Sequence, residues 1–306
     1  MKKRAFIILL LILLIACQRK DTTPTPQTYR SGNQGLALSF APNLPPPTII
    51  AEQREPLQIL VNVENRGTST VGGGQDRLYL HGFDPNIITG ISTQGQPIRV
   101  LEGRGPYVQR GEFDTISFRA RVTLPEGVDR IQQPIYATAC YTYETVATGQ
   151  VCIDPNPFSP YAQQKVCTPS AINLGSQGAP VAVQNVNVIA QPGRTRFEIT
   201  ISNVGGGTVF DPNKIAQCNP NSPGLGPNDI DRVLVEEVSV SGQNIIDTCK
   251  PRLREQRGLF PLQSRTITCE LEDIRGESAY ITPITVKLRY GYKTTIPKIV
   301  TVISST

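Results

Sequence analysis

Residues 61–67 read VNVENRG, and residues 199–205 read ITISNVG. Both stretches alternate β-branched and polar residues, as a half-buried strand does, and both end on Asn-x-Gly, which tolerates the positive φ of a turn. In each case a valine, Val71 or Val209, follows six positions after the asparagine. The match predicts that the chain contains one β-rich unit twice.

Two further matches occur in the same order. Residues 76–80 (DRLYL) correspond to residues 231–235 (DRVLV), and residues 141–145 (YTYET) correspond to residues 290–294 (YGYKT). Glycine and proline, 26 of each, place turn-prone segments throughout the chain. Six or seven short strands per unit, with turns between them, are typical of an immunoglobulin-like β-sandwich.

We therefore expect an all-β fold with two tandem immunoglobulin-like β-sandwich domains. The first is assigned to residues 35–160 and the second to residues 178–306, with an interdomain linker at 161–177. The second unit is 17 residues longer between Val209 and Asp231. We assign this difference to an inserted loop at residues 210–228.

The first residues describe an export signal. Residues 1–4 (MKKR) are basic and residues 5–16 are apolar, which is too short for a membrane-spanning helix but typical of a secretory signal. Residues 14–17 (LIAC) resemble the lipobox of bacterial lipoproteins. The resemblance implies a signal peptide at residues 1–16, lipid attachment at Cys17, and a membrane-anchored, extracytoplasmic protein. An ordinary signal peptide with a chance cysteine and an uncleaved signal anchor are the alternatives.

The residues after Cys17 are polar, include two prolines and show no apolar periodicity. Such a composition buries too little surface to offset the entropy of ordering. We expect residues 17–34 to form a lipidated cysteine and a disordered tether.

Cysteine usage agrees with export. Removing Cys17 from the seven cysteines leaves an even number, and the chain has one histidine and no CxxC pair. This favours disulfides over a metal site. The six cysteines are Cys140, Cys152, Cys167, Cys218, Cys249 and Cys269. Spacing does not determine the pairing. The hypothesis is a Cys167–Cys218 bond that staples the inserted loop to the linker, a Cys140–Cys152 bond across a closing hairpin with its turn at residues 145–149, and a Cys249–Cys269 bond around the basic segment.

Charge and motifs argue against several function classes. The chain has 30 Lys+Arg and 25 Asp+Glu, and the signal accounts for three of the basic residues, so no electrostatic argument for nucleic acid remains. Paired catalytic carboxylates, a P-loop and dinucleotide-binding glycines are absent as motifs. His81, the single histidine, cannot join a multi-histidine metal site. We expect no enzyme activity, no cofactor and no metal.

Three features are candidate sites. A basic segment could dock an anionic glycan, phospholipid head groups or an acidic partner, with a solvated loop as the alternative; its charges are Lys250, Arg252, Arg254 and Arg257. Asp-Pro-Asn occurs at residues 84–86, 154–156 and 211–213, where turn chemistry is the first reading and calcium binding the second. The repeated Tyr-x-Tyr-x-Thr predicts a core tyrosine whose hydroxyl bonds the backbone, with a carbohydrate platform as the alternative.

The repeat with its IxVxNxGxxxV opening is similar to the CARDB-like and other Ig-like modules of prokaryotic surface proteins, and its tandem, lipobox-bearing arrangement resembles that of archaeal cell-surface proteins. The resemblance implies adhesion, matrix or assembly roles. We expect a structural or interaction protein that presents two Ig-like domains to a protein or glycan partner at the cell surface. A glycan- or solute-binding lipoprotein is the alternative, as is a subunit of a surface filament or secretion complex that accepts a donated strand. The oligomeric state stays open.

Overall fold

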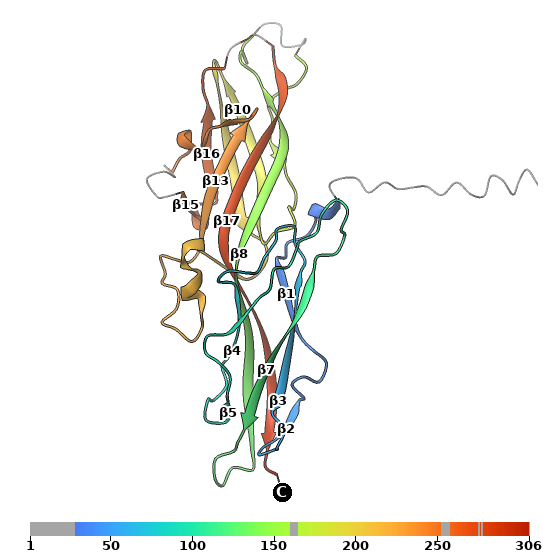
Figure 1. Cartoon of the computed structure of the whole chain (residues 1–306). Coiled ribbons are helices and arrows are strands. Elements are labelled where there is room, and N and C mark those ends of the chain that lie inside the picture. The colour runs from blue at the N-terminus through green and yellow to red at the C-terminus, as the bar shows by residue number, and fades with distance from the viewer. Residues whose placement is uncertain (1–27, 160–164, 252–257, 275, 277, 306) are drawn as a thin grey trace, which may run out of the picture.

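The computed structural model describes residues 28–159, 165–251, 258–274, 276 and 278–305 (Figure 1). These residues form an all-β protein, as the sequence predicts. The strands are β1 Leu36–Phe40, β2 Thr48–Ile50, β3 Leu57–Asn65, β4 Arg77–His81, β5 Ile88–Thr89, β6 Gln96–Pro97, β7 Phe113–Val122, β8 Arg130–Ile153, β9 Ile172–Asn173, β10 Val181–Gln191, β11 Arg194–Asn203, β12 Thr208–Phe210, β13 Arg232–Val240, β14 Gln243–Asn244, β15 Leu259–Pro261, β16 Thr266–Leu271 and β17 Tyr280–Ile303. The short 3-10 helices are η1 Thr28–Arg30, η3 Pro212–Cys218, η4 Ile246–Thr248 and η5 Leu262–Ser264.

Two long strands run through the whole molecule. β8 and β17 each contain 24 residues and pair antiparallel over their full length, from Arg130↔Ile303 to Ile153↔Tyr280. At about 3.3 Å per residue each strand is roughly 80 Å long. They form the centre of a nine-stranded sheet with the order β14-β13-β17-β8-β4-β6, to which β2, β12 and β15 add short pairings. Figure 1 shows this pair as the spine of an elongated molecule.

Two four-stranded sheets pack against the spine, one at each end (Figure 1). The β1 half consists of the sheet β1-β3-β7-β5 with residues 130–141 of β8 and 292–303 of β17. The β10 half consists of the sheet β16-β11-β10-β9 with residues 143–153 of β8 and 280–290 of β17. Alternating apolar side chains of both layers are fully buried between the sheets; on β3 these are Ile59, Val61 and Val63.

The internal repeat appears in three dimensions as symmetric strand pairing. Positions 149 residues apart in the two repeats lie on β8 and β17, and the register is symmetric about the pair Thr142↔Gly291. As a result, the end of β8 belongs to the β10 half and the end of β17 returns to the β1 half. Residues 35–160 and 178–306, the two expected domains, therefore share one nine-stranded sheet, because the spine crosses the predicted boundary.

Four tyrosines form the core where the halves meet. Tyr141 pairs with Tyr292 and Tyr143 with Tyr290, and neighbouring ring centroids are 5.8 to 6.3 Å apart. The hydroxyl of Tyr141 accepts a hydrogen bond from Leu36 N at 3.1 Å, and that of Tyr290 accepts one from Val181 N at 3.2 Å. The tyrosine prediction is confirmed and extended, since both tyrosines of each motif are buried. Burial raises the pKa of Tyr143 to about 12.

Three disulfides link the described residues, and they correct the predicted pairing. Cys249–Cys269 forms as predicted, whereas Cys167–Cys218 and Cys140–Cys152 do not. The observed bonds are Cys140–Cys218 and Cys152–Cys167, with Cα–Cα distances of 6.0 and 5.9 Å. The prediction placed Cys140 and Cys152 across a hairpin, but both lie on the single strand β8. The three bonds indicate an oxidising, extracytoplasmic compartment.

The inserted loop contacts both halves of the molecule and not the β10 half alone. It contains η3, and Cys140–Cys218 holds it to the middle of β8, where Ile215 packs with Tyr79 of β4. Asn219 Nδ2 also donates to Thr93 O of the β1 half at 3.1 Å. The extra residues of the second repeat therefore join the two halves.

Parts of the predicted tether and linker are ordered. Residues 28–34 lie against the body: Gly32 N donates to Ser176 Oγ at 3.1 Å, and Asn33 Nδ2 donates to Val204 O at 2.8 Å. Residues 172–173 of the predicted linker form β9. Composition missed both because tertiary contacts supply the partners that these polar residues need. Within the described residues, no helix has the length and apolar character to cross a membrane.

Candidate functional site

Among the described residues, two stretches of the spine have no strand partner on their outer side. On the side facing away from β17, β4 covers residues 136–140 of β8, and within the described part of the chain no strand pairs with residues 143–153 on that side. Along β17, β12 covers residues 291–293 and β2 covers residues 301–303, which leaves residues 294–300 uncovered. Unpaired strand edges of this kind are templates for pairing with another chain.

Hydrogen-bond direction identifies the residues that face outward. Thr142 N donates to Asp76 Oδ1 at 3.0 Å and therefore points away from β17. Because direction alternates along an antiparallel strand, the outward positions of the uncovered stretch of β8 are Glu144, Val146, Thr148, Gln150 and Cys152, the last of which is bonded to Cys167. We call the first four residues the β8 edge. All four retain a backbone N–H and C=O.

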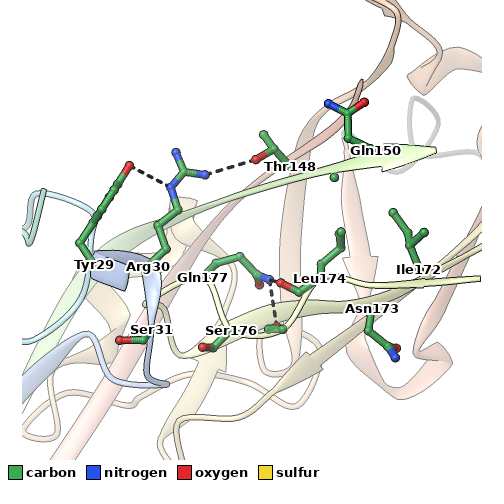
Figure 2. A pocket seen from close by; sticks show the side chains of 12 residues that line it. Tyr29, Arg30, Ser31, Thr148, Gln150, Ile172, Asn173, Leu174, Ser176 and Gln177 are labelled. Atoms are coloured by element: carbon green, nitrogen blue, oxygen red, sulfur yellow. Dashed lines mark hydrogen bonds between the residues drawn. The ribbon is translucent and has the colours of Figure 1, made fainter. Parts of the chain in front are cut away.

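The β8 edge borders a groove of about 620 Å³ at the open side of the β10 half (Figure 2). Thr148, Gly149 and Gln150 form one wall, and the β9 region forms the other. Figure 2 shows Ile172 and Leu174 pointing across the groove toward β8. Their side chains occupy the space in which a Cβ on Gly149 would stand, with Ile172 Cδ1 only 2.8 Å from that position.

Hydrogen bonds fix the side chains on both sides of this groove. Arg30 donates through Nη1 to Thr148 Oγ1 at 3.4 Å, and through Nε to the hydroxyl of Tyr29 at 3.1 Å (Figure 2). Opposite, the buried Gln177 amide donates to Gly175 O at 3.0 Å and accepts from Val183 N at 3.0 Å. Residues 29–31, within the predicted tether, therefore form one end of the groove.

The corresponding stretch of β17 is closed by its side chains. The outward positions are Thr295, Pro297 and Ile299, which we call the β17 edge; the N–H of Thr301, bonded to Pro47 O at 2.9 Å, confirms the direction. Pro297 has no N–H to offer a partner. Lys298 points inward at the same place, with Nζ 5.6 Å from the centroid of the Phe40 ring. Burial lowers the pKa of Lys298.

The repeat pairs these positions one by one. Thr148 corresponds to Pro297 and Gly149 corresponds to Lys298, each 149 residues apart. Proline on an edge strand and an inward-pointing charge both prevent the addition of another strand. The β17 edge carries both features, and the β8 edge, its repeat equivalent, carries neither.

The basic segment lies largely outside the described residues. Lys250 is exposed, and its backbone exchanges hydrogen bonds with Thr268 at 2.7 and 3.0 Å beside the Cys249–Cys269 disulfide. Arg252, Arg254 and Arg257 are not described, and neither is Cys17. The anionic-ligand loop and the lipid site stay predictions.

His81 and the Asp-Pro-Asn segments have structural partners. His81 Nε2 lies 2.9 Å from Thr138 Oγ1, its ring stacks on Tyr136, and burial followed by the charge of Lys293 lowers its pKa. In each Asp-Pro-Asn segment the asparagine N–H donates to the aspartate carboxylate, at 2.8 to 3.1 Å, as a turn requires. The described residues contain no group of three or more metal-ligating side chains.

Asp76 is a buried carboxyl group whose pKa is raised. It accepts hydrogen bonds from Thr142 N and from Gly72 N at 2.8 Å. Burial raises its pKa from 3.8 to about 6, and the two hydrogen bonds oppose that rise. Asp76 lies next to Arg77, the first residue of β4, and binds Thr142 of β8 just before the stretch of β8 that has no strand partner. This position suits a structural role, in which the carboxylate ends the pairing between β4 and β8.

Sequence reasoning missed the β8 edge as a site. Its residues are polar or small and belong to no motif, and the long strand was read as a closing hairpin around residues 145–149. Comparing Thr148 with Pro297 across the repeat was the available signal. No family model matches the chain and no curated protein sequence is similar to it, so the likeness to CARDB-like modules stays a resemblance in strand and turn pattern.

Proposed function

We propose that this protein is an exported lipoprotein, held to a membrane through Cys17, that binds an extended segment of a partner protein along the β8 edge. This is a binding role without catalysis, of the kind that adhesion and cell-envelope assembly require. The lipobox-like residues 14–17 and the three disulfides support the location. The fold supports the binding role.

The observation that carries the proposal is the difference between two equivalent edges. The β17 edge is closed by Pro297 and Lys298, whereas the β8 edge keeps every outward N–H and C=O at Glu144, Val146, Thr148 and Gln150. An added strand would satisfy these groups through main-chain hydrogen bonds, and the groove beside them would receive alternate side chains.

A polypeptide fits this site better than a sugar. Outward amides recur every second residue, which is the repeat of an extended peptide. Carbohydrate sites usually offer a broad aromatic platform, and the chain contains no tryptophan. Tyr29 is the single aromatic residue that lines the groove, and Arg30 binds its hydroxyl.

Site-specific photo-crosslinking in the native envelope tests the proposal. A photoreactive residue at Gln150 should give an adduct with a protein, whereas the same residue at Ile299, its repeat equivalent on the β17 edge, should not. Thr148→Pro should abolish the adduct, because it removes an outward N–H. The variant should stay folded, since that N–H does not pair with β17.

Adducts that form equally at both positions, or that persist in Thr148→Pro, would show that strand addition at the β8 edge is wrong. An adduct of twice the mass of the chain would identify a second copy as the donor of the strand.

A further inference from the structure

A rigid loop with an apolar tip projects near the point where the described chain begins. Gly105 N donates to Val108 O at 2.8 Å and Val108 N donates to Gly105 O at 3.2 Å, which closes a tight turn around Pro106 and Tyr107. The Tyr107 side chain at the tip is 98% exposed, and Val108 is 53% exposed. Two hydrogen bonds and a proline thus hold an aromatic side chain out in solvent.

Basic side chains flank this tip. Arg104 and Arg110 lie on either side of the turn, and neither takes part in an ion pair with another described residue. Together with Arg66 they line a hollow of about 270 Å³. Glu64, the acidic residue in the lining, already pairs with Arg66 at 2.8 Å. Among the described residues, neither Arg104 nor Arg110 has a carboxylate partner; Arg104 is held by Ser31 O with its Nε buried, so Arg110 is the exposed cation of the hollow.

The loop and the first described residues lie together. The Arg104 guanidinium donates to Ser31 O, Arg104 N donates to Gly67 O at 2.7 Å, and residues 32–34 line the same hollow. Figure 1 shows η1 and the loop before β7 on the same side of the molecule, at the waist where the two halves meet. The described part of the chain thus starts near the middle of the spine rather than near either of its ends.

Chain length limits the distance to the bilayer. Eleven residues separate Cys17 from Thr28, so at about 3.5 Å per residue the lipid-bearing cysteine lies within roughly 40 Å of the waist. This is about half the length of the spine. A protein anchored in this way keeps its waist near the membrane surface.

We propose that the loop at residues 104–110 contacts the anionic phospholipid bilayer to which the chain is anchored, with Tyr107 and Val108 at the head-group level and Arg110 against phosphates. Tyrosine suits a membrane interface because its ring is apolar and its hydroxyl is polar. Basic side chains at an anionic surface add attraction that falls within a Debye length. The contact orients the spine along the bilayer. This inference rests on the proposed lipid anchor.

The absence of tryptophan from the chain permits a clean test. Tyr107→Trp places one tryptophan at the tip, and Phe158→Trp places one at a side chain that is 80% exposed, beyond the end of β8. Each full-length lipoprotein is reconstituted into phosphatidylcholine vesicles with and without phosphatidylglycerol. Flotation reports anchoring, and quenching by brominated lipid reports insertion.

We expect the indole of the Tyr107→Trp variant to be quenched several-fold more strongly than that of the Phe158→Trp variant, with a blue-shifted emission. Phosphatidylglycerol should strengthen the quenching, and Arg110→Gln should reduce that gain. Vesicles that float with the protein but quench both tryptophans equally would overturn the loop contact and leave the anchor standing. A protein that does not float would overturn both.

Discussion

At the β8 edge the outward positions are Glu144, Val146, Thr148 and Gln150, whereas at the β17 edge they are Thr295, Pro297 and Ile299. Both stretches belong to one strand pair and derive from one repeat. The pairing register of β8 with β17 is the same in the two halves, so the edges differ in their side chains, and on our proposal this difference decides which edge accepts a partner. A duplicated unit can close one copy of an edge and keep the other for binding, without changing the core that both share.

The inserted loop is the largest difference between the repeats, and its disulfide should have the largest effect on stability. Replacing Cys140 and Cys218 by serine should lower the free energy of unfolding by about 4 kcal/mol, because this bond closes a long loop in the unfolded chain. Urea unfolding without reductant measures the loss. The matched control, serine at Cys152 and Cys167, closes a span of 15 residues and should cost about 3 kcal/mol. A smaller loss at Cys140–Cys218 than in the control would contradict the role of the insertion in joining the halves.

Asp76 should make the stability of the β1 half depend on pH. Its pKa is about 6 in the folded protein, above the unfolded value, so the folded state binds more protons. The contribution to stability is full below about pH 4 and is lost as the pH rises through 6, a change of about 3 kcal/mol. Asp76→Asn should remove this dependence in unfolding measured from pH 4 to pH 7. Asp231→Asn, the repeat equivalent at a partly exposed position, is the control, and equal pH profiles for the two variants would refute the assignment.

The tyrosine core should respond symmetrically, unlike the edges. Tyr141→Phe and Tyr290→Phe each remove a buried hydroxyl that accepts a backbone N–H, from Leu36 and Val181 respectively. Each change should cost about 2 kcal/mol, since the buried donor is left without a partner. Tyr107→Phe, at an exposed hydroxyl, should leave the unfolding midpoint unchanged. A large difference between the two core variants would mean that the halves are not equivalent at their junction.

Opening the closed edge should have the smallest effect. Pro297→Thr places the residue of the β8 edge at the equivalent position of β17 and restores one outward N–H. We expect self-association to strengthen by about tenfold, or about 1.4 kcal/mol, in sedimentation velocity. Thr148→Pro, the reciprocal change, should not promote self-association. If Pro297→Thr stays at the wild-type association state, proline is not what closes this edge.

Much of the fold could be predicted from local pattern. Alternation on both sides of Asn65 and Asn203 identified the strands and the repeat, because one buried face requires every second residue to be apolar. Tyr-x-Tyr-x-Thr predicted one core tyrosine in each repeat with its hydroxyl on the backbone, as in a tyrosine corner. Domain boundaries could not be predicted in this way. Nothing local states that β8 continues past Tyr143 into the other half, since an alternating pattern fits a hairpin and a long strand equally.

The cysteines show the same limit. Their even number predicted disulfides, yet the choice of partners depends on which strands lie side by side. Cys140 meets Cys218 because the inserted loop folds back over β8, a contact between residues 78 positions apart. Six cysteines allow fifteen pairings, and spacing alone does not select among them.

By itself, the sequence determined that the chain is all-β, repeats one unit and contains six cysteines that can pair; the export signal at its start stays a prediction. These properties follow from residue type and period, which are local. The tertiary structure alone decided that the halves exchange the ends of their longest strands, that Thr148 and Pro297 occupy equivalent edges, and that Tyr107 projects beside the start of the described chain. Each of these three features depends on hydrogen-bond register and packing between distant segments, and none of them is encoded in the spacing of neighbouring residues.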